Sequence, residues 1–135
     1  MLKCGRVEGG IQMIVGIGID MVELNRISDA VQKGEGLALR VLTEKEFAQF
    51  KTFTDRRKVE FLGGRFAAKE AVSKALGTGI GSSLSFQQIE VFVSELGAPQ
   101  MKINAPNIDE NITIHVSISH TKTTAIAQVI LERVI

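Results

Sequence analysis

The order of apolar and polar positions predicts a strand first, then helices, and then a series of strands. Apolar, mostly β-branched residues fill Met13–Ile19, which we interpret as a buried strand that ends at Asp20. Gly16 and Gly18 share one face of this strand, which suggests that another segment packs closely there. Helical spacing of apolar residues then predicts a helix over Val22–Val31, followed by a glycine-containing loop.

Two further helices are predicted before the strands resume. Thr43 and Glu46 have the spacing of a capping box and predict a short helix. A long helix is expected from Arg56 to a stop at Gly77. The doublet Gly63-Gly64 inside it costs about 1 kcal/mol per glycine relative to alanine, so we expect close approach of another backbone, or a kink, at that point.

The second half of the chain alternates with a period of two. Strands are predicted over Ile89–Val93, Gln100–Ile103, Ile112–Ile118 and Thr124–Leu131, with a polar loop over Asn104–Asn111. Helices followed by consecutive strands favour an α+β fold, in which helices pack on a largely antiparallel sheet within a single small domain.

Composition fits one globular domain of 135 residues, with 44% hydrophobic residues and a net charge of +1. The low net charge and the absence of Trp and Tyr disfavour nucleic-acid binding. No apolar run is long enough for a membrane span. Cys4 is the only cysteine, which excludes an internal disulfide and indicates a reducing compartment, the cytoplasm.

The first residues of the chain differ from the rest. Residues 1–12 lack the apolar core of a signal peptide, and we interpret them as a flexible leader before a domain over residues 13–135. Met13 is an equally acceptable natural start of the protein.

Three places carry candidate chemistry, each weak on its own. Asp20 either caps the following helix or presents a catalytic carboxylate at a strand end, and position alone leaves both open. Glu70 and Lys74 lie one helical turn apart, a spacing more often found in a solvated ion pair. His120 follows Ser119 directly, which is poor geometry for a nucleophile and its base.

Divalent-metal phosphate chemistry fits these residues together. Carboxylates such as Asp20 and Glu70, from different elements, can hold Mg²⁺ and leave room for water and substrate phosphates. Lys74, one turn beyond Glu70, can neutralise a leaving phosphate oxygen. The segment Gly77–Gly81 is not a P-loop, but its glycines allow a backbone to approach a nucleotide closely.

Three segments also carry a family resemblance, in the family's own order. VGIGID at Val15–Asp20 is similar to the first motif of the 4′-phosphopantetheinyl transferases. GRFAAKEAVSKALGTGIG at Gly64–Gly81 resembles their second motif, in the form used by the short bacterial holo-[acyl-carrier-protein] synthases. HVSISHT at His115–Thr121 resembles their C-terminal motif. The similarity extends from Met13 onward and favours a functional role for Glu70 and Lys74.

The resemblance implies an enzyme that transfers 4′-phosphopantetheine from coenzyme A to a serine of an apo acyl carrier protein, in support of fatty acid biosynthesis. Adenosine 3′,5′-bisphosphate is the other product. By motif position, Asp20 and Glu70 would hold Mg²⁺ against the diphosphate. Glu70 would also remove the serine proton, directly or through a metal-bound water, and Lys74 would stabilise the leaving phosphate.

The resemblance also implies the residues that bind coenzyme A. Gly77, Thr78 and Gly79 would border its adenosine half, and His120 with Thr121 would face its phosphates. Arg65 is assigned to the 3′-phosphate.

The implied carrier protein is acidic, so a local basic patch would have to bind it. Arg26 is the main candidate, with Lys33 and Arg40 nearby in sequence, although a solvated helix face explains them equally simply. The resemblance further implies a homotrimer with sites between subunits, in which His120 and Asp20 of one site come from different chains. The rival hypothesis is a module that binds coenzyme A or a carrier protein without transferring anything.

Overall fold

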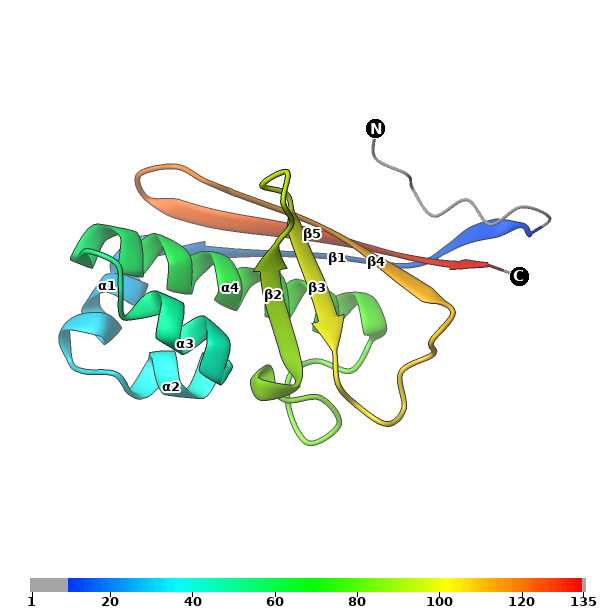
Figure 1. Cartoon of the computed structure of the whole chain (residues 1–135), viewed down its shortest axis with the longest axis horizontal. Helices are drawn as coiled ribbons and strands as arrows, with labels where there is room; N and C mark the ends of the chain where they lie inside the picture. The colour runs from blue at the N-terminus through cyan, green and yellow to red at the C-terminus, as the bar shows by residue number, and fades with distance from the viewer. Residues whose placement is uncertain (1–9, 135) are drawn as a thin grey trace.

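The computed structural model describes residues 10–134, which are organised around one long helix, α4 (Figure 1). The elements in chain order are β1 (Gln12–Glu23), α1 (Leu24–Gln32), α2 (Gly36–Val41), α3 (Glu44–Phe50), α4 (Asp55–Leu76), a 3₁₀ turn η1 (Phe86–Gln88), β2 (Ile89–Val93), β3 (Pro99–Ile103), β4 (Ile112–His120) and β5 (Thr124–Val134).

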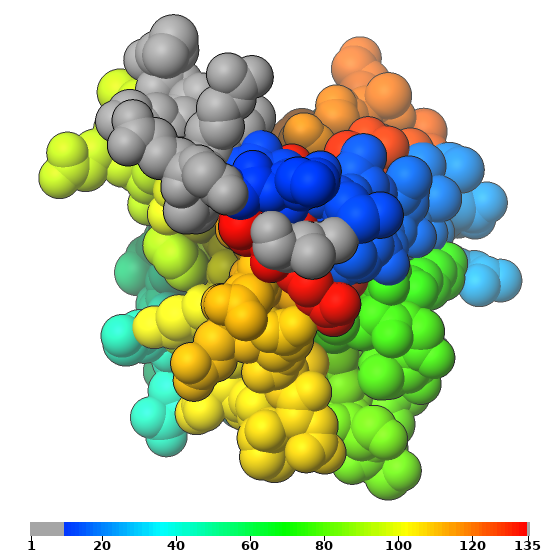
Figure 2. Space-filling model, turned by 90° about the vertical axis from the view of Figure 1, so that its right-hand side faces the viewer, coloured from blue at the N-terminus to red at the C-terminus, as the bar shows by residue number. Residues whose placement is uncertain are grey.

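The strands form two antiparallel sheets, so the predicted α+β class is confirmed, although the prediction described one sheet. The larger sheet has the order β1-β5-β4, and β2 and β3 form a separate hairpin. Gln12 pairs with Val134, and Figure 2 shows the start of β1 beside the end of β5. Asp20 and Ile118 both pair with Ala127, so β1 and β4 lie on opposite sides of β5 at this level.

The helices cover only one face of the three-stranded sheet, as Figure 1 shows. On this inner face, Ala127, Val129 and Leu131 of β5 are buried against α4. On the outer face, Ile17, Ile19 and Met21 are 61%, 54% and 65% exposed. The prediction of a buried strand over Met13–Ile19 is therefore wrong for one of its faces, because no described element covers that face.

The glycines of β1 lie against the backbone of α4, as the sequence predicted. A Cβ atom at Gly18 would fall on the carbonyl oxygen of Ala71, and one at Gly16 on that of Ala75. The other predicted close approach differs in kind, since α4 continues unbroken through Gly63-Gly64. A Cβ there would meet side chains from other elements rather than another backbone: Leu24 Cδ2 at 2.6 Å from Gly63 and Ile118 Cγ2 at 3.2 Å from Gly64.

The boundary after β1 corrects two predictions. β1 continues through Glu23, so α1 begins at Leu24 rather than at Val22. Asp20 therefore lies inside the strand and does not cap the helix, which leaves its carboxylate available for other contacts. β1 also begins at Gln12, inside the segment predicted as a leader; the other leader positions through residue 9 lie outside the described residues, and the leader remains a prediction.

A buried ion pair that the sequence did not predict joins α3 to α4. Lys69 Nζ lies 2.6 Å from Glu46 Oε1, and the two side chains are 0% and 2% exposed. Glu46 also completes the predicted capping box with Thr43, which is confirmed. Its second carboxylate oxygen accepts a hydrogen bond from the Val91 backbone N–H at 2.8 Å. Because the ammonium nitrogen and both carboxylate oxygens of this pair have hydrogen-bond partners, the pair connects α4 firmly to α3 and to the β2–β3 hairpin.

Candidate active site

Asp20 and Glu70 line the same pocket, which has a volume of about 650 Å³. We call it the carboxylate pocket. Asp20 reaches it because the even-numbered residues of β1 from Gly16 onward face α4, and Glu70 reaches it from α4. Two arginines come from the neighbouring helices, Arg26 from α1 and Arg40 from α2. The remaining lining residues are Met21, Val22, Glu23, Ile27, Leu37 and Phe66.

Lys74 joins this group from the next turn of α4. Its Nζ atom donates hydrogen bonds to Asp20 Oδ1 at 2.9 Å and to the Ile19 carbonyl oxygen at 3.1 Å. The Asp20 side chain is 16% exposed, whereas that of Lys74 is 53% exposed. The ammonium group is therefore held over the carboxylate while it remains accessible from solvent.

The pKa of Glu70 is raised, first by burial and second by the negative charge of Asp20, while Lys74 and Arg40 act in the opposite direction. Neighbouring carboxylates that repel each other are stabilised by a cation between them. Among residues 10–134, no group of three or more His, Cys, Asp or Glu side chains gathers as a metal site. A metal held by Asp20 and Glu70 would then keep ligands from water or substrate, which is the behaviour of Mg²⁺.

His120 and Thr121 lie on the other side of α4, at the end of β4. His120 Nδ1 is 3.7 Å from Glu60 Oε2 of α4. The Thr121 hydroxyl accepts hydrogen bonds from the backbone N–H groups of Thr123 and Thr124, at 3.2 and 3.1 Å, and so shapes the β4–β5 turn. Asp20 is on β1 and His120 is on β4, the two edge strands on either side of β5. These strands are two strand spacings apart, a distance of about 10 Å. Within one chain, His120 and Thr121 therefore do not join the carboxylate pocket.

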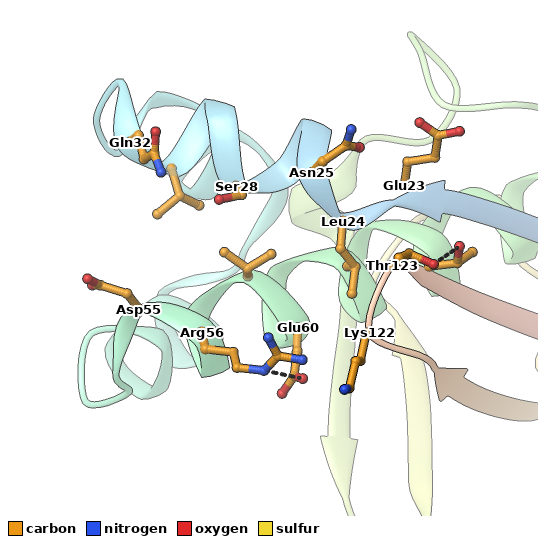
Figure 3. Close-up of a pocket in the computed structure, with 13 residues that line it drawn as sticks. Glu23, Leu24, Asn25, Ser28, Gln32, Asp55, Arg56, Glu60, Lys122 and Thr123 are labelled. Atoms are coloured by element: carbon orange, nitrogen blue, oxygen red, sulfur yellow. Dashed lines mark hydrogen bonds and ion pairs between the residues drawn. The ribbon is translucent and has the colours of Figure 1, made fainter.

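Glu60 also lines a second hollow, which we call the α1–α4 groove (Figure 3). This groove has a volume of about 650 Å³ and ends at the turn containing Lys122 and Thr123. Arg56 Nε lies 3.6 Å from Glu60 Oε2 on its α4 wall. Glu23 lines both hollows, so they adjoin at the start of α1.

The predicted adenosine-binding segment follows Lys74 at the C-terminal end of α4. Gly77 and Gly79 have φ values of +79° and +65°, and the left-handed conformation of Gly77 ends the helix as predicted. The N–H groups of Thr78 and Gly79 donate to the Ser73 carbonyl oxygen at 3.1 and 3.2 Å. The segment thus begins one turn beyond the pocket's lysine.

Arg65 lies apart from both hollows. It is 7% exposed, and its guanidinium carbon is 4.1 Å from the centre of the Phe61 ring. Burial lowers its pKa to about 10, with Glu46 opposing the shift. Its Nε atom has no hydrogen-bond partner among the described residues. Arg65 is therefore a buried cation with a spare donor, which suits an anionic ligand but does not identify one.

The predicted basic patch divides between two places. Arg26 and Arg40 line the carboxylate pocket, whereas Lys33 is exposed at the end of α1 and does not line it. Sequence reasoning placed Arg40 with the patch only by its proximity in the chain. No periodic pattern of apolar residues predicted α2, and the position of Arg40 in the pocket became evident only from the fold.

An α+β scaffold that brings two carboxylates and two arginines to one pocket, with Lys74 bonded to one of the carboxylates, suits a protein that handles phosphate groups. The family model of the 4′-phosphopantetheinyl transferase superfamily matches residues 16–130. The chain belongs to this superfamily.

Comparison with individual relatives agrees with the match to the superfamily model. The chain is 52% identical over 121 residues to the holo-[acyl-carrier-protein] synthase of Bacillus velezensis, covering 90% of this chain and 98% of the relative. The corresponding protein of Anoxybacillus flavithermus is 50% identical over 121 residues, with the same coverage. A crystal structure of a holo-(acyl-carrier-protein) synthase from Bacillus anthracis, in complex with CoA (3′,5′-ADP), has a TM-score of 0.80 and 48% identity, covering 90% of this chain and 98% of that one. The Neisseria meningitidis synthase has a TM-score of 0.77 and 36% identity, with 88% and 98% coverage.

Proposed function

We propose that the protein is a holo-[acyl-carrier-protein] synthase, which transfers 4′-phosphopantetheine from coenzyme A to a serine of an apo acyl carrier protein. The observation that carries the proposal is the pocket shared by Asp20 and Glu70, with Lys74 hydrogen-bonded to Asp20, in a chain from this superfamily. Coenzyme A is the co-substrate, as the bound ligand of the Bacillus anthracis relative suggests. The product would support fatty acid biosynthesis.

Asp20 and Glu70 would together hold Mg²⁺ in the pocket. Two carboxylates, with no third acidic or histidine ligand gathered beside them among the described residues, suit a cation that takes its other ligands from water and phosphate. When bound, the cation would neutralise and orient the diphosphate of coenzyme A.

The residues of the pocket then divide the reaction between them. The serine hydroxyl oxygen forms a bond to the β-phosphorus, and the bond from this phosphorus to the bridging oxygen breaks. Glu70 would accept the serine proton, directly or through a metal-bound water. The electron pair of the broken bond stays on adenosine 3′,5′-bisphosphate, whose new charge the ammonium group of Lys74 neutralises.

Several residues would bind coenzyme A around this centre. Gly77, Thr78 and Gly79 lie one turn beyond Lys74, where a glycine backbone can border the adenosine half. His120 and Thr121 would contact its phosphates. Arg65, a buried cation with a spare donor, would bind the 3′-phosphate.

We infer a homotrimer in which neighbouring chains share each site. His120 and Asp20 lie on opposite edges of one sheet, so a second chain would have to bring His120 to the pocket. The exposed apolar residues Ile17, Ile19 and Met21 offer a surface for such an assembly.

The carrier protein would dock beside α1. Arg26 lies in the first turn of α1 and is exposed at the carboxylate pocket, and Lys33 is exposed at the other end of this helix. Both would pair with acidic side chains of the carrier. No helix among residues 10–134 is long and apolar enough to cross a membrane. We place the reaction in the cytoplasm, in keeping with the single cysteine of the chain.

The test is incubation of the protein with an apo acyl carrier protein, coenzyme A and Mg²⁺, followed by mass spectrometry of the carrier. Transfer predicts a covalent gain of one phosphopantetheine group that EDTA abolishes. The rival binding module predicts complex formation without a mass gain under any metal condition, and that result would overturn the proposal.

A further inference from the structure

The side chain of Gln87 holds the end of α2. The two hydrogens of its Nε2 atom face the carbonyl oxygens of Leu39 and Leu42, at N···O distances of 2.8 and 2.6 Å, and one of them is shared with the carbonyl oxygen of Arg40 at 3.3 Å. The carbonyl oxygen between them, that of Val41, accepts from Lys69 Nζ at 2.7 Å. The last carbonyls of a helix have no partners within the helix. Two side chains from distant elements therefore take all the carbonyls from residue 39 to residue 42.

Arg40 is the charged residue on this held segment. Its side chain lines the carboxylate pocket together with Asp20 and Glu70. Its guanidinium carbon lies 5.8 Å from the centre of the Phe86 ring, and Phe86 directly precedes Gln87 in η1. One short turn therefore contacts both the backbone and the side chain of Arg40. No ion pair within residues 10–134 engages this guanidinium.

We propose that Gln87 is a positioning residue of the active site, which holds Arg40 at the carboxylate pocket so that its guanidinium binds the diphosphate of coenzyme A. The inference rests on the proposed function. A guanidinium in a fixed place can bind phosphate oxygens in a bidentate manner. The diphosphate is the expected ligand because Arg40 lines the pocket with the two carboxylates and its positive charge acts on Glu70, one of the two proposed metal ligands.

The chemistry of the Gln87 amide group suggests a substitution that removes the donor and keeps the shape of the side chain. The amide nitrogen, not the oxygen, must face three carbonyl oxygens, because only the nitrogen donates. Gln87→Glu keeps the shape but turns an acceptor toward acceptors, which should release the end of α2. Gln87→Ala removes the side chain beyond Cβ. Gln87 is exposed and Lys69 still holds Val41, so both variants are expected to fold. Gln100→Glu, on the exposed surface of β3, repeats the charge change away from the pocket.

The test compares Gln87→Glu, Gln87→Ala, Arg40→Ala and the double variant Gln87→Ala/Arg40→Ala with the wild-type chain. Steady-state transfer gives kcat and separate KM values for coenzyme A and apo carrier, and calorimetry with Mg²⁺ gives the Kd of coenzyme A without turnover. Each single variant should raise KM and Kd for coenzyme A by ~10-fold, the size expected for one charged hydrogen bond. KM for the carrier should change little, and Gln100→Glu should behave as wild type.

The double variant decides how Gln87 acts. If Gln87 works through Arg40, the double variant is no worse than Arg40→Ala, because the group that Gln87 positions is already absent. Effects that multiply would show an independent structural role and would overturn the inference. A rise confined to KM for the carrier would overturn the assignment of Arg40 to coenzyme A. Unfolding of both Gln87 variants, seen by circular dichroism, would make Gln87 a purely structural residue.

The two readouts also separate this inference from the proposed function. If wild-type protein transfers nothing but binds coenzyme A, the proposed function falls and the calorimetric cycle still decides the role of Gln87. If wild-type protein does not bind coenzyme A, both fall together.

Discussion

Lys74 and Asp20 are 54 positions apart in the chain, yet Lys74 Nζ lies 2.9 Å from Asp20 Oδ1. This contact lies where α4 crosses β1, and the close packing of α4 on the β1 glycines sets that crossing. It also brings Glu70, one turn earlier in α4, to the same pocket as Asp20.

Replacing Lys74 should separate stability from activity. The Lys74 side chain is 53% exposed, and a pair open to solvent contributes about 0–1 kcal/mol to stability. Lys74→Met should therefore unfold in urea almost as wild type does, while transfer falls by ~100-fold because a stabiliser of the leaving group is missing. If Lys74→Met lost more free energy of unfolding than it lost in transition-state stabilisation, both expressed in kcal/mol, the role given to Lys74 would be contradicted.

In the metal-free protein, ionised Glu70 should lower the free energy of unfolding at neutral pH. Its pKa is raised in the folded state, chiefly by burial, so deprotonation is harder when folded than when unfolded. The penalty is absent below the unfolded-state pKa, grows as pH rises through the interval between the two values, and is complete above the folded-state pKa.

Glu70→Gln should accordingly raise the Tm in EDTA at pH 8 and leave it nearly unchanged at pH 3. Thermal unfolding followed by circular dichroism measures both values. Glu95→Gln, on the exposed turn of the β2–β3 hairpin, is the matched control. An equal rise of the Tm at both pH values would show that the effect does not come from titration of the carboxyl group.

The packing of α4 on β1 predicts a severe effect from one methyl group. In Gly18→Ala the new Cβ would fall on the carbonyl oxygen of Ala71, and we expect a loss of ~3 kcal/mol or more, at the upper end for overpacking. Gly36→Ala is the control, because a Cβ there has no other atom within 4 Å. Urea unfolding compares the two variants, and similar stabilities would show that α4 does not pack as described.

A shared site predicts complementation between inactive variants. Asp20→Ala and His120→Ala should each lose transfer when assembled alone. Subunits of both kinds, mixed after reversible dissociation, should regain activity wherever a chain with intact Asp20 adjoins one with intact His120. Failure to regain activity in mixed oligomers, once their mixing is confirmed by native mass spectrometry, would place the whole site within one chain.

The alternation of residues was sufficient to predict the strands. α4 is buried around most of its middle and has little periodicity, so it was predictable from its helix-forming residues and its stop at Gly77. Periodicity gave no help for α2, whose six residues are too few for a helical pattern and whose end is held by Gln87 and Lys69 from elsewhere. It also failed for the outer face of β1, since an apolar run gives no sign of which side remains uncovered.

The site was predictable to a similar degree. Motif resemblance brought Asp20, Glu70 and Lys74 together before the fold was known, and in the structure Asp20 and Glu70 line one pocket while Lys74 contacts Asp20. The position of Arg40 depends on how α2 packs, and the Lys69–Glu46 pair depends on burial of two charges that sequence alone assigns to the surface.

The most direct test of the account is the binding of a paramagnetic cation at Asp20 and Glu70. Mn²⁺ prefers the same oxygen ligands as Mg²⁺, and electron paramagnetic resonance counts the bound fraction in the presence of coenzyme A. The account predicts one bound Mn²⁺ per chain in the wild-type protein and loss of that binding in both Asp20→Asn and Glu70→Gln. Wild-type binding in either variant would contradict the claim that these carboxylates together hold the metal.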